Sequence, residues 1–220
     1  MKAMILAAGY GKRLAPLTND LPKPLLKVGD KALIEHNIET LSKYGVKEIV
    51  INVSYLGQQI IDFLNDKFPN LKINFLLEEK PLGTGGGIVN ALSYFEKPFI
   101  VMNADIFHSI DLNNLDINTE SAHLIGVENP SHNLTGDFSI ENDVVVINEI
   151  NTHTWSGISI INPKIFENAT LGNIYDIWRD IFPRYIKDQK ITACETNDFW
   201  MDVGTIERLE LANKIYKEEN

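Results

Sequence analysis

Two glycines and three cations near the start of the chain are the residues best suited to chemistry in this sequence. Gly9 and Gly11 follow a short apolar run. Lys12 and Arg13 come directly after them, and Lys23 lies between two prolines. Glycines let a backbone approach a ligand closely, and backbone N–H groups with nearby cations hold phosphate oxygens. The segment therefore predicts a phosphate-binding loop, in which Arg gives bidentate contacts and Lys a movable point charge.

The spacing of this loop differs from the common nucleotide-binding motifs. It has no Gly-Lys-Ser/Thr sequence, which a P-loop requires, and Leu14 stands where a dinucleotide fingerprint has its third glycine. We expect the whole turn to contact a nucleotide, through Ala7, Ala8, Gly9, Gly11, Lys12, Arg13 and Lys23.

Two aspartates could supply a metal site. Asp105 follows a predicted strand directly, and Asp202 lies between a short strand and the start of a helix. Mg²⁺ prefers carboxylate and phosphate oxygens, so the two side chains could hold one ion against a phosphate. Taken alone, Asp202 is better explained as a residue of a helix N-terminus.

A second glycine-rich run, Gly83–Gly87, could lie against a base or ribose. It could equally be a tight strand-to-helix turn capped by Thr84. Glu78 and Glu79 just before it could accept hydrogen bonds from a base edge, or simply be exposed. The nucleotide contacts expected in this region are Gly83, Gly85 and Gly86.

The elements that position these residues change character along the chain. The first half alternates strands at 3–8, 48–53, 71–77 and 98–102 with helices at 31–44, at 57–68 and from the 83–87 turn to 95. This order predicts a mostly parallel sheet with helices on both faces. Ligands bind at the carboxyl ends of such strands, where the phosphate loop, the 83–87 turn and Asp105 would meet.

The second half is β-rich. We expect closely spaced strands at 121–127, 137–140, 143–150 and 154–161, and edge strands at 190–194 and 199–203. A helix should begin near Gly172 and end or kink at Pro183, and Thr205 should cap a final helix. Backbone N–H groups and hydroxyls in this half suit a sugar, although plain hairpin turns explain them equally well. The expected substrate contacts are Asn103, Gly136, Asp137, Ser156 and Gly157.

Composition limits the possible partners. The formal net charge of −10 argues against nucleic acid and anionic membranes. A single cysteine, Cys194, excludes an internal disulfide and fits a reducing compartment. We find no secretion or membrane segment, so we expect a cytoplasmic protein, either a monomer or a small homo-oligomer. The 220 residues should form one domain, with a nucleotide-binding part at 1–120 and a sugar-binding part at 121–220.

The loop resembles the signature of the sugar-phosphate nucleotidyltransferases, in which G-x-G-x-R precedes a P-K-P element. Here Gly9, Gly11, Arg13, Pro16-Leu17-Thr18 and Pro22-Lys23-Pro24 fall in that order. The resemblance also implies metal ligands at Asp105 and at Asp202, which stands in the family's D-x-G-T context. Ala104 replaces the glycine that usually precedes the first aspartate. The fold implied is Rossmann-like and glycosyltransferase-A-like, with a small β-rich part.

The resemblance implies attack by a sugar 1-phosphate on a nucleoside triphosphate, with Mg²⁺ and release of pyrophosphate. It assigns Arg13 to the triphosphate tail and Lys23 to the attacking and α-phosphates. Gly136-Asp137-Phe138 and Ser156-Gly157-Ile158-Ser159 favour an enzyme of peptidoglycan recycling that uses UTP and N-acetylmuramate 1-phosphate. Enzymes that use mannose or glucose 1-phosphate with GTP or dTTP are the alternatives. A non-catalytic nucleotide-sugar-binding domain is a further alternative.

Overall fold

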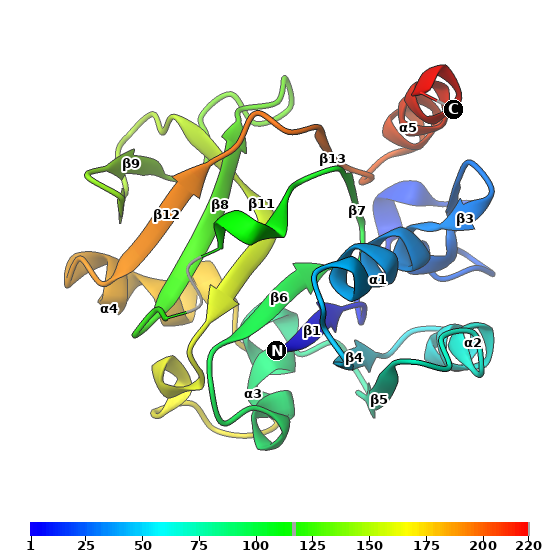
Figure 1. Ribbon diagram of the computed structural model, residues 1–220, viewed down its shortest axis with the longest axis horizontal. Coiled ribbons are helices and arrows are strands. Elements are labelled where there is room, and N and C mark those ends of the chain that lie inside the picture. Colours follow the sequence, from blue (N-terminus) through cyan, green and yellow to red (C-terminus); the bar gives the residue numbers. More distant parts are fainter. Residues whose placement is uncertain (116–117, 220) are drawn as a thin grey trace. The chain divides into compact units, whose positions relative to one another are not determined.

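Strand β1 (Lys2–Leu6) lies in a parallel ladder, and its own middle residues are fully buried. In the computed structural model, which describes residues 1–115 and 118–219, β1 pairs with β4 (Glu48–Val53), and β4 pairs with β5 (Lys72–Leu77) (Figure 1). Ile5 lies opposite Ile51, which lies opposite Phe75. The apolar run in β4 is the pattern expected of a parallel strand buried on both faces.

The chain forms two compact units that alternate along the sequence. Unit 1 contains Met1–Pro81, Met102–His108 and Trp200–Asn220, and unit 2 contains Leu82–Val101 and Ser109–Phe199. Strand β6 (Phe99–Asn103) begins in unit 2 and ends in unit 1. The division into parts 1–120 and 121–220 of a single domain stays a prediction.

Three helices belong to unit 1. They are α1 (Leu33–Lys43), α2 (Gly57–Leu64) and α5 (Ile206–Glu219). The first turn of α1 is held by Glu35, whose carboxylate accepts a hydrogen bond from the Ala32 N–H at 2.8 Å. Gly45, with φ of 86°, ends this helix in the left-handed conformation that glycine adopts readily. Both ends of the predicted helix are thus close to those observed.

The same unit contains two short antiparallel ladders. Strands β2 (Lys27–Val28) and β3 (Lys31–Ala32) form one, and β7 (Ile106–His108) pairs with β13 (Trp200–Asp202) in the other. Helix α5 packs against β2, where the Asn213 carboxamide bonds to backbone groups of Lys27 and Gly29 at 3.0 Å each. The C-terminal helix is therefore fixed on its own unit.

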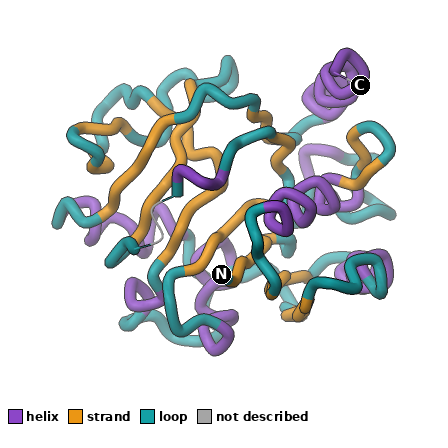
Figure 2. Tube along the Cα trace, viewed as in Figure 1, coloured by secondary structure: helices purple, strands orange, loops and turns teal. Residues whose placement is uncertain are grey.

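Unit 2 is mainly β-sheet; strands of both units are orange in Figure 2. Its strand order is β11-β8-β12-β10-β9. These strands are β8 (Ala122–Glu128), β9 (Ser139–Glu141), β10 (Val144–Val146), β11 (His153–Ile161) and β12 (Ile191–Glu195). Only β8 and β12 are parallel; the other three pairs are antiparallel. Its helices are α3 (Gly83–Ala91), a π-helix at Ile177–Ile181 and α4 (Phe182–Lys187). Short 3₁₀ turns lie at Leu92–Tyr94, Leu112–Asn114 and Pro163–Phe166.

The parallel first part and the mixed, β-rich second part confirm the predicted fold class. Several details of the prediction are wrong. Strand β12, expected at an edge of the sheet, lies between β8 and β10. Its parallel partner β8 is far away in the sequence, so the pattern within β12 does not reveal the pairing. No helix starts at Gly172. Pro183, by contrast, lies in the first turn of α4, directly after the π-helix ends at Ile181, so the change of helix type fits the predicted kink or end at this proline. Helix α2 ends at Leu64, before the positive φ of 58° at Asp66. No helix in the described residues has the length and apolar character needed to cross a bilayer.

Candidate active site

The phosphate loop leaves β1 and folds back on the Pro-Lys-Pro turn, within unit 1. The Ala7 N–H donates to the Asn52 side chain at 3.0 Å, which fixes the start of the loop. Gly11 has φ of 64°, and a Cβ there would come within 3.1 Å of the side chains of both Lys23 and Thr18. The Thr18 hydroxyl donates to the Gly11 carbonyl at 2.9 Å. The two halves of the sequence motif are thus in contact.

The middle of the loop is open to a ligand. No atom lies within 4 Å of a Cβ placed at Gly9. Lys12 and Arg13 are exposed, and the Lys12 ammonium lies 5.1 Å from the centroid of the Tyr10 ring. Within residues 1–115 and 118–219, Arg13 makes no hydrogen bond or ion pair. Both cations can therefore meet an anion without first breaking a salt bridge.

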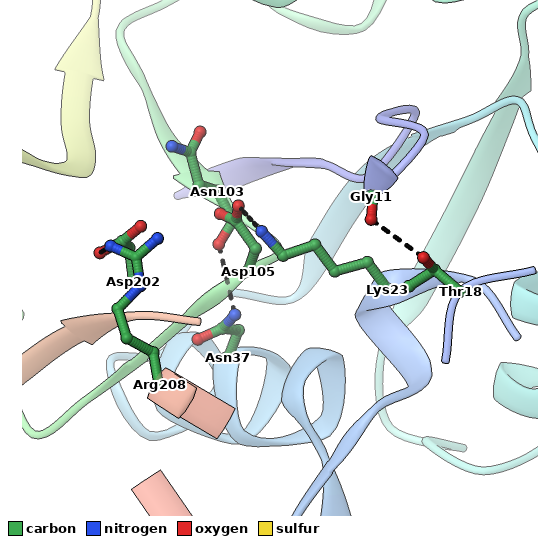
Figure 3. A network of polar contacts seen from close by, with 8 residues as sticks. All are labelled: Gly11, Thr18, Lys23, Asn37, Asn103, Asp105, Asp202 and Arg208. Carbon is green, nitrogen blue, oxygen red and sulfur yellow. Dashed lines mark hydrogen bonds and ion pairs between the residues drawn. The ribbon is translucent and has the colours of Figure 1, made fainter. Parts of the chain in front are cut away.

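Lys23 forms an ion pair with Asp105 (Figure 3). The lysine begins a 3₁₀ turn (Lys23–Leu25), and its side chain is 10% exposed against 35% for the aspartate. Asp105 follows the end of β6, where the Ala104 N–H donates to the Leu6 carbonyl at 3.1 Å. An ammonium so deeply buried needs a counter-charge, and Asp105 provides it. Lys23, which was expected to contact phosphate, thus contacts Asp105, which was expected to bind the metal.

The two aspartates, from distant parts of the sequence, come together at the β7–β13 ladder. Asp202 lies opposite Ile106, and the Val203 N–H donates to the Asp105 carbonyl at 2.8 Å. Asp202 also has a cation of its own, since Arg208 Nη1 donates to its Oδ1 at 2.8 Å. In the described residues no cluster of three or more His, Cys, Asp or Glu side chains could hold a metal. Two carboxylates nevertheless fit Mg²⁺, which takes its remaining ligands from water and substrate phosphates.

Two buried asparagines at this site were not predicted from the sequence. The Asn52 carboxamide, 2% exposed, accepts from Ala7 and donates to Glu78 at 2.8 Å. It links the phosphate loop to a carboxylate that is itself only 5% exposed, so Glu78 is not the exposed residue that one alternative allowed. Asn37 donates to the Asn103 carbonyl at 3.3 Å. A polar residue within the apolar run of β4 is a signal that could have identified Asn52.

The second glycine run forms the first turns of α3 in unit 2, rather than a loop ahead of the helix. The N–H groups of Gly85 and Gly86 donate to the Tyr175 carbonyl at 2.9 and 3.1 Å. A Cβ at Gly86 would lie 2.6 Å from the Asn173 carbonyl oxygen. Close packing against residues 173–175 therefore accounts for both glycines. The expected nucleotide contacts at Gly83, Gly85 and Gly86 stay predictions.

Asp137 has a structural role in unit 2. Its carboxylate accepts from the Trp155 N–H at 2.8 Å and from the Asn133 carboxamide at 3.0 Å. Gly136 has φ of 63°, and a Cβ there would lie 2.7 Å from the Asn151 carbonyl oxygen. These contacts join the turn before β9 to β11, and Asp137 also lines a cavity of 620 Å³ with Trp178 and Lys187.

Ser156 and Gly157 lie in β11, where the pairing with β8 is interrupted between Trp155 and Ser159. Ser156 is fully buried, its hydroxyl oxygen accepts from the Ile158 N–H at 3.2 Å, and Gly157 has φ of 78°. The sugar contacts expected at these residues stay predictions, as do those at Asn103, Gly136 and Asp137.

Comparisons with known proteins identify the family of this chain. A family model described as nucleotidyl transferase matches residues 2–126. The chain is 38% identical to N-acetylmuramate alpha-1-phosphate uridylyltransferase of Neisseria meningitidis serogroup B, over 98% of each sequence. It is 30% identical to D-glycero-alpha-D-manno-heptose 1-phosphate guanylyltransferase of Campylobacter jejuni, over 94% of this chain and 96% of that protein.

Solved structures confirm the fold. HddC from Yersinia pseudotuberculosis superposes with a TM-score of 0.81 at 30% identity, over 98% of this chain and 99% of that one. A putative glucose-1-phosphate thymidylyltransferase from Bacillus anthracis gives 0.87 at 22% identity, over 100% and 96% of the two chains. The second likeness supports only the Rossmann-like, glycosyltransferase-A-like fold. Because the family model matches more than half of the chain and a relative is 38% identical over nearly all of it, the protein belongs to the nucleotidyl transferase family.

Proposed function

We propose that this protein transfers a uridylyl group from UTP to a sugar 1-phosphate and releases pyrophosphate. We further propose that the sugar is N-acetylmuramate 1-phosphate, and that the reaction serves peptidoglycan recycling in the cytoplasm. The observation that carries the proposal is the assembly of Lys23, Asp105 and Asp202 beside the phosphate loop in unit 1. The choice of sugar and base is supported by the likeness to the Neisseria uridylyltransferase.

The reaction needs positioning and charge neutralisation more than acid–base catalysis. An oxygen of the sugar phosphate, already ionised at pH 7, attacks the α-phosphorus of UTP. The bond from that phosphorus to the bridging oxygen breaks, and its electron pair leaves with pyrophosphate. Transfers of this kind depend on alignment and on cations placed around the phosphates. A site built from several cations and two carboxylates suits such a reaction.

The side chains divide this work between them. Arg13 and Lys12, which no carboxylate of the described residues holds, would bind the triphosphate tail and the departing pyrophosphate. Lys23 would neutralise the attacking phosphate and the α-phosphate. Asp105 and Asp202 would hold Mg²⁺, which supplies positive charge to the phosphate oxygens when bound.

Lys23 must then exchange partners. In the free protein its ammonium is paired with Asp105, the carboxylate that would bind the metal. A flexible four-carbon stem lets the ammonium move to a nearby phosphate, which an Arg fork does less readily. The ion pair therefore keeps the Lys23 ammonium at the site until a phosphate replaces the Asp105 carboxylate as its partner.

A guanylyltransferase is the second candidate function. The 30% identity to the Campylobacter heptose 1-phosphate enzyme, over nearly the whole of both chains, favours it. Both candidates share the mechanism and differ in base and sugar. Glu78 would accept from the ring N–H that both uracil and guanine carry, so its presence does not separate the two.

The test is pyrophosphate release with Mg²⁺, across UTP, dTTP, GTP and CTP against N-acetylmuramate, N-acetylglucosamine, glucose, mannose and heptose 1-phosphates. A dominant signal for UTP with N-acetylmuramate 1-phosphate is expected. A dominant signal for GTP with a heptose or mannose phosphate would replace the proposal with the second candidate. No turnover in the whole grid, from folded protein, would contradict both and favour a non-catalytic nucleotide-sugar-binding domain.

A further inference from the structure

Arg208 is unusually enclosed for an arginine of this chain. Its side chain is 14% exposed, against 73% for Arg179 and 60% for Arg184. A guanidinium removed from water must be held by specific partners. Arg208 Nη1 donates to Asp202 Oδ1 at 2.8 Å, so the principal partner is the carboxylate proposed to bind the metal.

Gly204 leaves the space that this pair occupies. A Cβ at Gly204 would lie 2.2 Å from Arg208 Nη2 and 3.0 Å from Asp202 Oδ2. The backbone of Gly204 is outside the left-handed region, so the glycine supplies room rather than an unusual conformation. A larger residue at this position would require the guanidinium to shift from its place beside the carboxylate.

The backbone under Arg208 is held firmly. Thr205 caps α5, since its hydroxyl oxygen accepts from the Arg208 N–H at 3.3 Å and its carbonyl from the Leu209 N–H at 3.0 Å. Further along α5, Asn213 and Tyr216 tie the helix to the β2–β3 hairpin. The guanidinium therefore extends from a fixed helix turn, whereas the ammonium of Lys23 ends a flexible stem.

Polar groups near the Arg208–Asp202 pair still have unsatisfied hydrogen-bonding capacity. Figure 3 shows Arg208 and Asn37 on the same side of the two aspartates. In the described part of the chain, Arg208 Nε and Asn37 Oδ1 are both buried and have no hydrogen-bond partner. A buried donor and a buried acceptor with unused capacity are costly in a core but suit a site that holds ordered water.

We propose that Arg208 is a positioning residue for Asp202. By holding Oδ1, the guanidinium fixes the orientation in which the carboxylate meets a hydrated divalent cation carried by the nucleotide. The proposal rests on the proposed function, because it takes Asp202 as a metal ligand. It gives the two cations different tasks, since Lys23 leaves its aspartate when phosphate binds and Arg208 stays.

The test measures Mn²⁺ binding in the presence of UTP alone, by the EPR signal of free Mn²⁺, so that no turnover is needed. Arg208→Gln removes the charge, and Gly204→Ala displaces the guanidinium while leaving it in the chain. Either change should weaken Mn²⁺ binding about 10-fold or more, the usual effect of removing a group that orients a metal ligand. The double variant should be no weaker than the worse single one, because both act on one contact. Arg208→Lys should restore part of the binding.

The matched control is Arg184→Gln, an exposed arginine of unit 2 that lies 3.7 Å from Glu167. It should bind Mn²⁺ as wild type does. Circular dichroism and thermal melts identify folded variants, and Gly204→Ala keeps the test valid if Arg208→Gln does not fold. Unchanged or tighter Mn²⁺ binding in a folded Arg208 or Gly204 variant would overturn the proposal. Failure of the wild type to release pyrophosphate would instead contradict the proposed function.

Discussion

Replacing Lys23 by Met should abolish most turnover at a modest cost in stability. Met keeps much of the buried aliphatic stem and removes the ammonium. Asp105 then loses its partner, but its side chain is 35% exposed and water can reach it. We expect a loss of about 1–2 kcal/mol, the cost of an unpaired group, rather than the 3–5 kcal/mol of a fully buried pair. For a chain of this size the melting temperature should fall by about 2–8 °C.

The effect on catalysis should be much larger than the effect on folding. A cation placed against the reacting phosphates contributes to the transition state as an oxyanion donor does, which is about 10²–10³ in kcat, or about 3–4 kcal/mol. The assay is pyrophosphate release at saturating substrates, with a thermal melt of the same preparation. Because Lys23 occupies Asp105 in the free protein, the variant should also bind Mn²⁺ more tightly without nucleotide.

The matched control is Lys31→Met, which breaks the 2.8 Å pair of Lys31 and Glu39 in the same unit. These side chains are 38% and 35% exposed, so the loss of stability should be below about 1 kcal/mol, and turnover should not change. The reasoning is refuted if folded Lys23→Met protein keeps turnover within a few-fold of wild type.

Three further experiments, two on variants and one on the unchanged protein, test other parts of the structure. Asp202→Asn keeps the shape but not the charge of the carboxylate, so kcat at fixed Mg²⁺ should fall at least about 100-fold, and a normal Mg²⁺ titration would contradict the assignment. Gly86→Ala places a methyl group 2.6 Å from the Asn173 carbonyl oxygen, which should cost about 1–3 kcal/mol in thermal unfolding; an unchanged melting temperature would show that α3 can shift. Burial raises the pKa of the Cys194 thiol, so less thiolate is present at any given pH. Alkylation by iodoacetamide, followed by mass spectrometry, should be slower than for free cysteine at pH 8 and should still rise at higher pH, and rapid labelling at pH 7 would contradict this.

Much of unit 1 could be predicted because its signals are local. The apolar runs of β1 and β4 give the parallel strands, and the residues directly after each strand fall at the carboxyl edge whatever the exact register. The strand pattern therefore places Asp105 at the edge where the phosphate loop lies, and the family resemblance adds Lys23 as a phosphate-binding residue. Their direct ion pair was not predicted, because which charge a buried ammonium meets depends on the packing of loops far apart in sequence.

The second glycine run shows that one local signal can have two explanations. Glycines imply a backbone that something approaches closely, but they do not say what approaches. The pattern fits a nucleotide contact, which stays a prediction, and it also fits the close packing of residues 173–175, where the Gly85 and Gly86 N–H groups donate to the Tyr175 carbonyl. The parallel pairing of β12 with β8 was also not predicted, because a partner strand far away in the sequence leaves no sign in the pattern within either strand.

Asn52 and Arg208 show which residues of such a site can be found from the sequence and which cannot. Asn52 breaks an apolar strand, and a buried polar residue is a local conflict that partners must resolve, so its place in the strand pattern already points to function. Arg208 breaks no rule, since an arginine in the first turns of a C-terminal helix is ordinary and usually solvated. The space that Gly204 leaves for it and its pair with Asp202 arise because α5 begins shortly after β13. Residues of the first kind can be found by looking for conflicts in the sequence, whereas those of the second kind become visible only in the folded chain.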